Sequence, residues 1–432
     1  MTMDALHTLV VADLLIDSEG RIAALAAPGD NARAERSIDA TGQVIVPGLI
    51  QAHIHLCQTL FRGLAEDRPL LAWLRERIWP LEAAHDPDSL RASARLGVAE
   101  LLLGGTTAIL DMGTVHHTDA LFETAAETGI RYTGGKALMD AGDGVPPGLL
   151  EATAVALLES DKLADRWHER EGGRLRYAYS PRFALTATFD LLRSVAARAR
   201  ANQMLVHTHA SEQREETDLV RQRFGVSNIQ LLANLGLAET NACFAHCVWP
   251  EPEEFEVLAS GGASVVHCPS CNLKLSSGVA PIADYLEHGV NVALGADGAA
   301  SNNRLDGWEE LRLAGLLGKY RGGPTALPAV DLFEIATIGG ARALGLDADI
   351  GSIEIGKSAD LAVLELRRPH ALGPDDVYTQ LVYSARASDV RHVFVGGKAV
   401  VADGVLLAFK EADALADAAR QRSLLLKRAQ LG

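Results

Sequence analysis

The sequence predicts an α/β protein, a TIM-like (β/α)8 barrel with a small β-sandwich domain formed by both chain ends. Three observations support this fold class. The middle of the chain alternates short apolar runs with amphipathic helical stretches, both chain ends contain short strand patterns, and polar side chains follow several of the apolar runs. A length of 432 residues suits one large barrel with a smaller unit.

Both chain ends have the pattern of a small β-domain. Apolar runs with turn residues between them predict strands at 8–12, 22–25, 361–364, 390–395 and 399–401. Two unrelated β-extensions would give the same local pattern. We expect one composite domain, made of residues 1–46 and 348–410.

The middle of the chain, residues 47–347, is expected to form the barrel. Apolar residues spaced by three and four predict helices at 90–103, 187–201 and 253–258. The eight strands expected between helical stretches are 44–55, 106–112, 131–139, 175–182, 204–209, 242–246, 263–267 and 290–297. The last segment, 411–432, is predicted to hold an amphipathic helix that packs on the outside.

The composition is that of an ordinary globular protein, with 48% hydrophobic and 22% charged residues. Forty Lys and Arg residues against 56 Asp and Glu residues give a net charge of −16, which argues against nucleic acid or an anionic membrane as a partner. The five cysteines are few and odd in number, which favours a reducing compartment. Because the first residues lack a secretion signal and no apolar run is long enough to span a bilayer, we expect a cytoplasmic protein.

His53 and His55 close the first expected barrel strand. Residues two apart point to the same side of a strand, so the two imidazoles can bind one ion together. Neutral imidazole is a common ligand of zinc, iron and nickel. Since His-x-His also occurs on ordinary surfaces, a metal site needs further ligands at other strand ends.

Such candidates end later strands of the expected barrel. His209 closes the fifth strand, His246 the sixth and Asp297 the eighth, and Glu212 follows His209 by three residues. A barrel brings the carboxyl ends of its strands to one face. The predicted ligands of one divalent ion, zinc or else iron, are His53, His55, His209 and Asp297.

Other side chains near these strand ends have alternative interpretations. His207 competes with His209, which we prefer because it lies closer to the following loop and to Glu212. His267 ends the seventh strand and is interpreted as a packing residue or as a support for a ligand. Cys268 and Cys271 could bind zinc as a thiolate pair, although the sequence has no second such pair.

With these motifs the chain resembles the amidohydrolase superfamily, in its cytosine deaminase and chlorohydrolase-like branch. The resemblance covers nearly the whole chain, and its motifs lie at residues 47–55, 209–212, 245–247, 295–298 and 351–361. It implies a metal-dependent hydrolase barrel that acts on a small heterocycle, and a homodimer or homotetramer.

Two subgroups of this branch share features with the chain. Gln58 and residues 135–140, 181–183 and 270–278 resemble guanine deaminase, whereas residues 62–67 and 297–303 resemble the S-adenosylhomocysteine and methylthioadenosine deaminases. The first hypothesis is hydrolytic deamination of a guanine-like 2-amino-4-oxo ring, such as guanine, a pterin or an oxidised purine. The alternatives are deamination of S-adenosylhomocysteine, methylthioadenosine or adenosine, a triazine-type hydrolase, and a barrel without catalysis.

The resemblance also implies roles for individual residues. The bound ion would activate water, with Asp297 as ligand and base, Glu212 as the group that moves protons, and His246 as the group that stabilises the attacking oxygen. The residues expected to bind the substrate are Gln58, Glu82, Arg182 and Phe183. Since a guanidinium only donates hydrogen bonds, Arg182 favours a ring carbonyl, and the alternative role is pairing with a structural carboxylate.

Overall fold

The computed structural model describes residues 1–29, 34–373 and 376–431. Eight parallel strands form a closed barrel, in which the last strand returns to the first through the pairing of Leu294 with Gln51. In chain order the barrel strands are β4 (Leu49–His55), β5 (Thr106–Met112), β6 (Arg131–Gly135), β8 (Leu175–Pro181), β9 (Leu205–Ala210), β10 (Ala242–His246), β11 (Ser264–His267) and β12 (Val292–Leu294). Two short strands, β7 (Ala137–Leu138) and β13 (Asp297–Gly298), follow β6 and β12 in the chain and pair with β8 and β4. The predicted fold class is confirmed.

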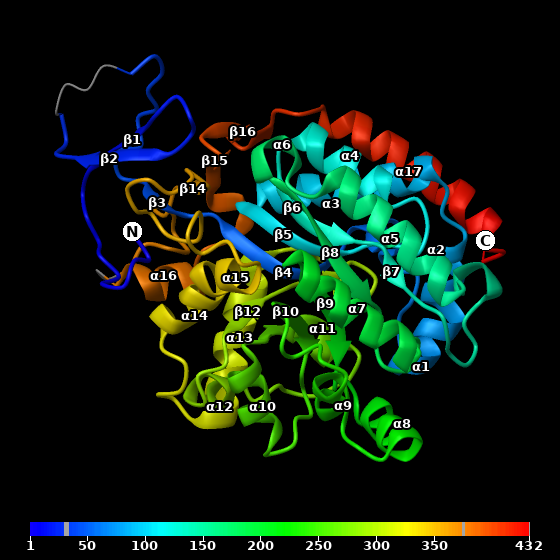
Figure 1. Cartoon of the computed structure of the whole chain (residues 1–432). Coiled ribbons are helices and arrows are strands. Elements are labelled where there is room, and N and C mark those ends of the chain that lie inside the picture. Colours follow the sequence, from blue (N-terminus) through cyan, green and yellow to red (C-terminus); the bar gives the residue numbers. More distant parts are fainter. Residues whose placement is uncertain (30–33, 374–375, 432) are drawn as a thin grey trace.

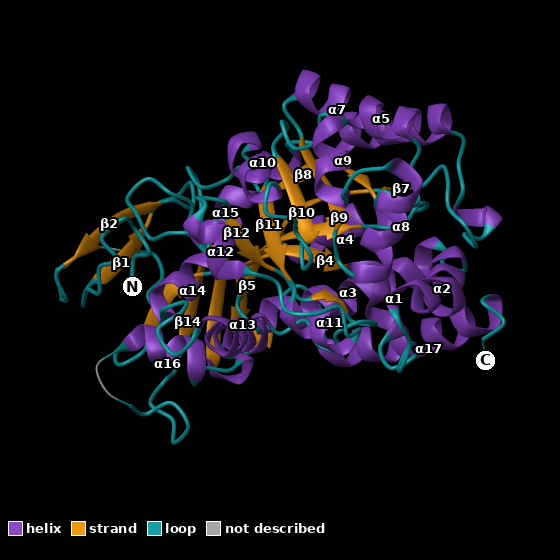
Figure 2. Ribbon diagram, turned by 90° about the horizontal axis from the view of Figure 1, so that it is seen from below, coloured by secondary structure: helices purple, strands orange, loops and turns teal. Residues whose placement is uncertain are grey.

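Helices surround the strands, which occupy the centre of the molecule (Figure 2). The longer helices are α3 (Pro87–Leu103), α4 (Asp119–Thr128), α5 (Thr153–Trp167), α7 (Phe189–Asn202), α8 (Arg214–Phe224), α10 (Glu254–Gly261), α13 (Gly307–Gly322), α14 (Ala329–Ala336) and α17 (Glu411–Arg428). The shorter helices are α1 (Leu70–Trp73), α2 (Trp79–Ala83), α6 (Arg170–Gly173), α9 (Asn228–Asn234), α11 (Pro269–Lys274), α12 (Ile282–Glu287), α15 (Ile338–Ala343) and α16 (Val377–Tyr383). Single helical turns are η1 (Leu56–Phe61), η2 (Leu74–Ile78), η3 (Pro147–Leu149) and η4 (Ala387–Asp389).

Local sequence explains where these elements begin. Helix α3 starts at Asp86, whose carboxylate accepts a hydrogen bond from the Ser89 amide, and Pro87 occupies the first helical position. The barrel strands are buried along most of their length, which fits their continuous apolar sequences. The polar side chains in these strands are therefore buried and need hydrogen-bond partners inside the protein.

The chain ends form a second, antiparallel sheet beside the barrel. Its strand order is β17 (Val405–Leu406), β16 (Lys398–Ala402), β15 (Val390–Val395), β14 (Leu361–Leu364) and β3 (Val44–Pro47). The hairpin of β1 (Asp13–Ile16) and β2 (Ile22–Ala26) packs on this sheet through a small apolar cluster that includes Ile22 and Leu361. Figure 1 shows this hairpin at the edge of the molecule, and the C-terminal helix α17 along the outside of the barrel, where it contacts α3.

Four expected strands are absent or divided in the structure. One of them, the run 131–139, divides into β6 and β7 at Lys136. The run 8–12 is not a strand, and its side chains Leu9 and Val11 are 57% and 85% exposed. The run 44–55 divides at Gly48, where a β-carbon would lie 2.2 Å from the Thr107 side chain, so that its first part joins the small sheet and its second part the barrel. The run 290–297 divides into β12 and β13 around Gly295, whose missing β-carbon leaves room for the His53 backbone.

The domain boundaries, 1–46 with 348–410, 47–347 and 411–432, stay predictions. Within the three described ranges, no helix has both the length and the apolar character that crossing a bilayer requires. The five cysteines are buried and have free thiols.

Candidate active site

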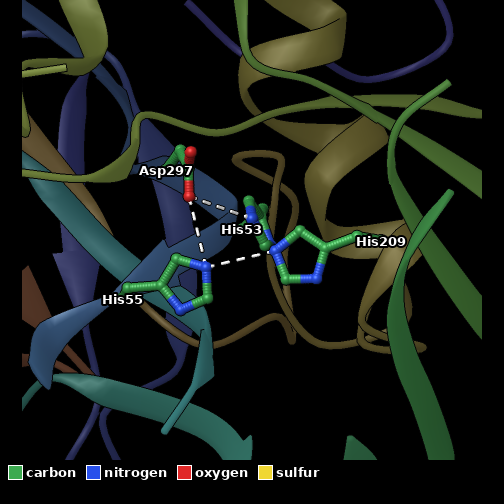
Figure 3. Close-up of side chains that lie close together, drawn as sticks. All are labelled: His53, His55, His209 and Asp297. Atoms are coloured by element: carbon green, nitrogen blue, oxygen red, sulfur yellow. Dashed lines mark hydrogen bonds and ion pairs between the residues drawn. The ribbon is translucent and has the colours of Figure 1, made fainter. Parts of the chain in front are cut away.

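The four predicted metal ligands converge at the carboxyl ends of the barrel strands (Figure 3). One donor atom from each of His53, His55, His209 and Asp297 lies within 4.8 Å of the other three. His53 and His55 come from β4 and point to the same side, as residues two apart on a strand do. His209 comes from β9, and Asp297 from the short β13 that pairs with the end of β4.

The hydrogen bonds of His55 and His209 fix where their lone pairs point. Nδ1 of His55 donates to the Met112 carbonyl at 2.8 Å, and Nδ1 of His209 donates to the Arg182 carbonyl at 2.7 Å. Burial lowers the pKa of His55 to about 4 and that of His209 well below its usual range, so both rings are neutral at pH 7. Each Nε2 therefore carries a lone pair, and these two atoms lie 3.3 Å apart. Two facing lone pairs beside a carboxylate are the arrangement that a cation stabilises.

His207, the competing residue of strand β9, turns away from the donor group and binds His53 instead. Its Nε2 lies 2.7 Å from Nδ1 of His53. Nε2 of His53 has no hydrogen-bond partner among the described residues and lies 3.1 Å from Oδ1 of Asp297. His207 thus orients the His53 ring, a role that the sequence did not reveal.

Asp297 is an anion at neutral pH despite its burial. Burial raises the pKa of this carboxyl, but the His53 ring beside it, with His55 and His246 nearby, outweighs burial and holds that pKa well below its usual value. Its Oδ2 accepts a hydrogen bond from the Ser301 hydroxyl at 2.8 Å. The backbone of Asp297 has a φ of 60°, a strained value for a residue with a β-carbon, and the surrounding structure must hold it there.

Glu212 and His246 lie beside the donor group. Nδ1 of His246 donates to Oδ1 of Asn272 at 2.9 Å, so its Nε2 carries a lone pair, and that atom is 3.7 Å from Oε2 of Glu212. Burial, with Asp297 as a second cause, raises the pKa of Glu212 well above its usual value. A carboxyl whose pKa is raised beside one whose pKa is lowered is the pattern of an acid and base pair.

Gln58, Glu82 and Arg182 form a buried network next to these groups. The Glu82 carboxylate accepts hydrogen bonds from both terminal nitrogens of Arg182, at 2.5 and 3.1 Å, and one from the Gln58 amide at 3.1 Å. Of the two roles left open for Arg182, the structure thus contains the ion pair with a carboxylate. Substrate contacts by these residues remain predictions.

A cavity opens onto the donor group. Its wall includes Gln58, Arg182, Phe183, Glu212 and His246 together with three of the expected ligands. The sequence did not indicate the apolar part of the wall, because these residues look like ordinary core positions: Leu70, Trp73, Leu74 and Leu275. His267 is buried and belongs to none of the described candidate metal groups.

Comparisons with known proteins agree with this geometry. A family model described as "Amidohydrolase family" matches residues 44–400. The 5'-deoxyadenosine deaminase of Methanothermobacter thermautotrophicus is 40% identical over 385 residues, which cover 89% of this chain and 87% of that protein. A 5-methylthioadenosine/S-adenosylhomocysteine deaminase of Halobacterium salinarum is 40% identical over 420 residues, which cover 96% and 94% of the two chains.

Three solved structures are also similar. An adenosine deaminase from Xanthomonas campestris with bound zinc has a TM-score of 0.92 and 31% identity, covering 99% of this chain and 97% of that chain. Atrazine chlorohydrolase from Arthrobacter aurescens, complexed with zinc, has a TM-score of 0.91 and 27% identity, covering 98% and 97%. The guanine deaminase of E. coli has a TM-score of 0.82 and 30% identity, covering 90% and 92%.

Proposed function

The chain belongs to the amidohydrolase family, and from this premise we propose that it is a metal-dependent deaminase of 5′-modified adenine nucleosides. The observation that carries this proposal is the 40% identity, over 89% of the chain or more, to deaminases named for 5'-deoxyadenosine and for 5-methylthioadenosine and S-adenosylhomocysteine. Guanine deaminase is a more distant structural neighbour, with a lower TM-score than the adenosine deaminase. The adenine nucleoside therefore replaces the guanine-like ring as the preferred substrate.

We assign one divalent ion to His53, His55, His209 and Asp297. The facing lone pairs of His55 and His209 support this assignment, and zinc is the proposed metal because two similar structures contain it. Iron remains the alternative metal. When bound, such an ion acts as a Lewis acid that lowers the pKa of water.

The side chains around the ion can move the protons that deamination requires. Asp297, which is ionised, takes a proton from water, while the lone pair on Nε2 of His246 accepts a hydrogen bond that orients that water. Glu212, whose raised pKa favours the protonated form, donates to the ring nitrogen next to the carbon under attack. The water oxygen bonds to that carbon, and the amino group takes the proton held by Asp297 and leaves as ammonia when the carbon–nitrogen bond breaks. The new hydroxyl returns a proton to Glu212, so the ring keeps a carbonyl oxygen.

The cavity wall supports a 5′ substituent without charge. Leu70, Trp73 and Leu74 form an apolar side, and the cation of this wall, Arg182, is already paired with Glu82. Phe183 is proposed to pack against the purine ring, with Gln58 and Glu82 near the sugar. We therefore expect 5′-deoxyadenosine and 5′-methylthioadenosine to be better substrates than S-adenosylhomocysteine, whose amino acid end would need charged partners.

A substrate panel tests this proposal. Ammonia release is measured for 5′-deoxyadenosine, 5′-methylthioadenosine, S-adenosylhomocysteine, adenosine, guanine and isoxanthopterin with the zinc-loaded protein. We expect the highest kcat/KM for the first two compounds. If guanine or isoxanthopterin is the best substrate, a 2-amino-4-oxo ring is again the preferred substrate class. If none of the six compounds releases ammonia, a triazine-type hydrolase or a barrel without catalysis is favoured. The expected homodimer or homotetramer is tested separately by light scattering.

A further inference from the structure

We propose that Glu212, His246 and Cys271 form a second, inhibitory metal site, which binds a zinc or cadmium ion when free metal exceeds the need of the first site. One donor atom from each of the three residues lies within 4.8 Å of the other two. They come from the loop after β9, the end of β10 and the first turn of α11. Cys271 was considered at the sequence level only as a partner of Cys268, which does not belong to this donor group.

Two unpartnered atoms indicate that this group can take a ligand. Nε2 of His246 and Oε1 of Glu212 are buried and have no hydrogen-bond partner among the described residues. An unpaired buried polar atom is costly, and binding an ion would satisfy both of these atoms at once. The cavity wall includes Glu212 and His246, so an ion can reach them through the cavity, and Cys271 is fully buried.

The chemistry of the donors fits a thiophilic divalent ion. Thiolate, imidazole and carboxylate are the ligands of zinc sites in proteins, and the soft thiolate favours zinc or cadmium over magnesium or calcium. One thiolate and one carboxylate would neutralise the two charges of the ion. This neutralisation would reduce the repulsion between the second ion and the first ion nearby. Binding would displace the protons of the thiol and of the Glu212 carboxyl.

Occupation of this site would stop deamination. Glu212 would lose the proton that it donates, and His246 would lose the lone pair that orients water. This consequence rests on the proposed function, whereas binding of the second ion does not. The two are therefore measured separately.

Cobalt provides the binding test, because thiolate ligation gives Co²⁺ a sulfur-to-metal charge-transfer absorption. The ligands proposed for the first ion contain no sulfur, so this absorption reports the second site alone. The full-length protein is titrated with Co²⁺, and bound metal is counted by equilibrium dialysis and elemental analysis. We expect a first ion without the absorption and a second ion with it. Binding of only one ion at saturating Co²⁺, or a second ion without the absorption, would overturn the proposal.

Two cysteine variants identify the ligand. Cys271→Ser should bind the first ion and lose the charge-transfer absorption. It should need at least about tenfold more zinc to be inhibited, because the loss of a ligand costs no less affinity than the loss of a group that supports a ligand. Cys268→Ser, a matched change of a buried cysteine on the same segment, should behave as the unaltered protein. An absorption that persists in Cys271→Ser would refute the assignment. If Cys271→Ser does not fold, the titration of the unaltered protein still decides whether a sulfur ligand is present.

Discussion

Arg182, in the wall of the candidate active-site cavity, forms a two-point ion pair with Glu82, which lies 100 residues away in the chain. Both side chains are almost fully buried, at 3% and 1% exposure. The backbone of Arg182 has a separate function, because its carbonyl accepts the hydrogen bond from Nδ1 of His209. One residue thus supports a proposed metal ligand with its main chain and neutralises a buried carboxylate with its side chain.

Removal of one member of this pair should destabilise the fold more than removal of both. Arg182→Ala leaves the Glu82 charge buried without its partner, so we expect the free energy of unfolding to fall by about 3 kcal/mol or more. The double variant Arg182→Met with Glu82→Gln should lose less. Denaturant unfolding measures both, and a single variant no less stable than the double one would contradict this prediction. Metal content should stay unchanged, because the carbonyl that supports His209 remains.

His207 should control metal affinity without touching the ion. It holds Nδ1 of His53, so His207→Ala is expected to weaken metal binding by about 10- to 100-fold. Competition with a chromophoric chelator measures the affinity. The control is His85→Gln, which alters a buried histidine bound to the Cys57 carbonyl and should leave metal affinity unchanged. Equal affinities of the His207→Ala variant and the unaltered protein would contradict the role.

Glu212 should give the reaction an alkaline limit. Burial raises its pKa well above the usual value, so the acid form persists to higher pH than in a free carboxyl and is lost as the pH rises through this raised pKa. We expect kcat to fall on the alkaline side. Glu212→Gln should lower kcat by roughly a hundredfold or more while metal content is retained. Glu215→Gln, an exposed neighbour on α8, should change neither quantity. A Glu212→Gln variant with normal kcat would exclude Glu212 as the proton donor.

Asp111 should make the fold less stable as the pH rises from about 4 to 7. Burial raises its pKa from 3.8 to about 7, so in this interval the folded protein keeps a proton that the unfolded chain has lost. The contribution of this group to the free energy of unfolding then falls by about 1.4 kcal/mol per pH unit, and levels off above pH 7. Asp111→Asn removes the group, and the difference in stability between the two proteins should change with pH. A constant difference from pH 4 to 7 would contradict the prediction.

The sequence was sufficient where a local rule determines geometry. His53 and His55 share a side because of the strand period, and parallel strands in a barrel bring His209 and Asp297 to the same face as this pair. Strand 242–246 was predicted with its observed bounds.

Features set by contacts between distant segments could not be predicted. The pairing of Arg182 with Glu82 and the turn of His207 toward His53 depend on which side chains meet inside the barrel. The break at 290–297 depends on the close approach of His53 to Gly295, and the positive φ of Asp297 is imposed by that surrounding structure. The run 8–12 has the composition of a strand but finds no neighbouring strand to pair with, so its apolar pattern was misleading.

The division at Gly48 has a consequence for protein engineering. Strand Val44–Pro47 pairs antiparallel with Leu361–Leu364, and the next strand along the chain carries His53 and His55. Truncation of the chain within this small sheet would remove the strand pairing that holds the start of the strand with His53 and His55 in place. Shortened versions should therefore keep residues 44–47 and 361–364, and circular permutants should be opened elsewhere.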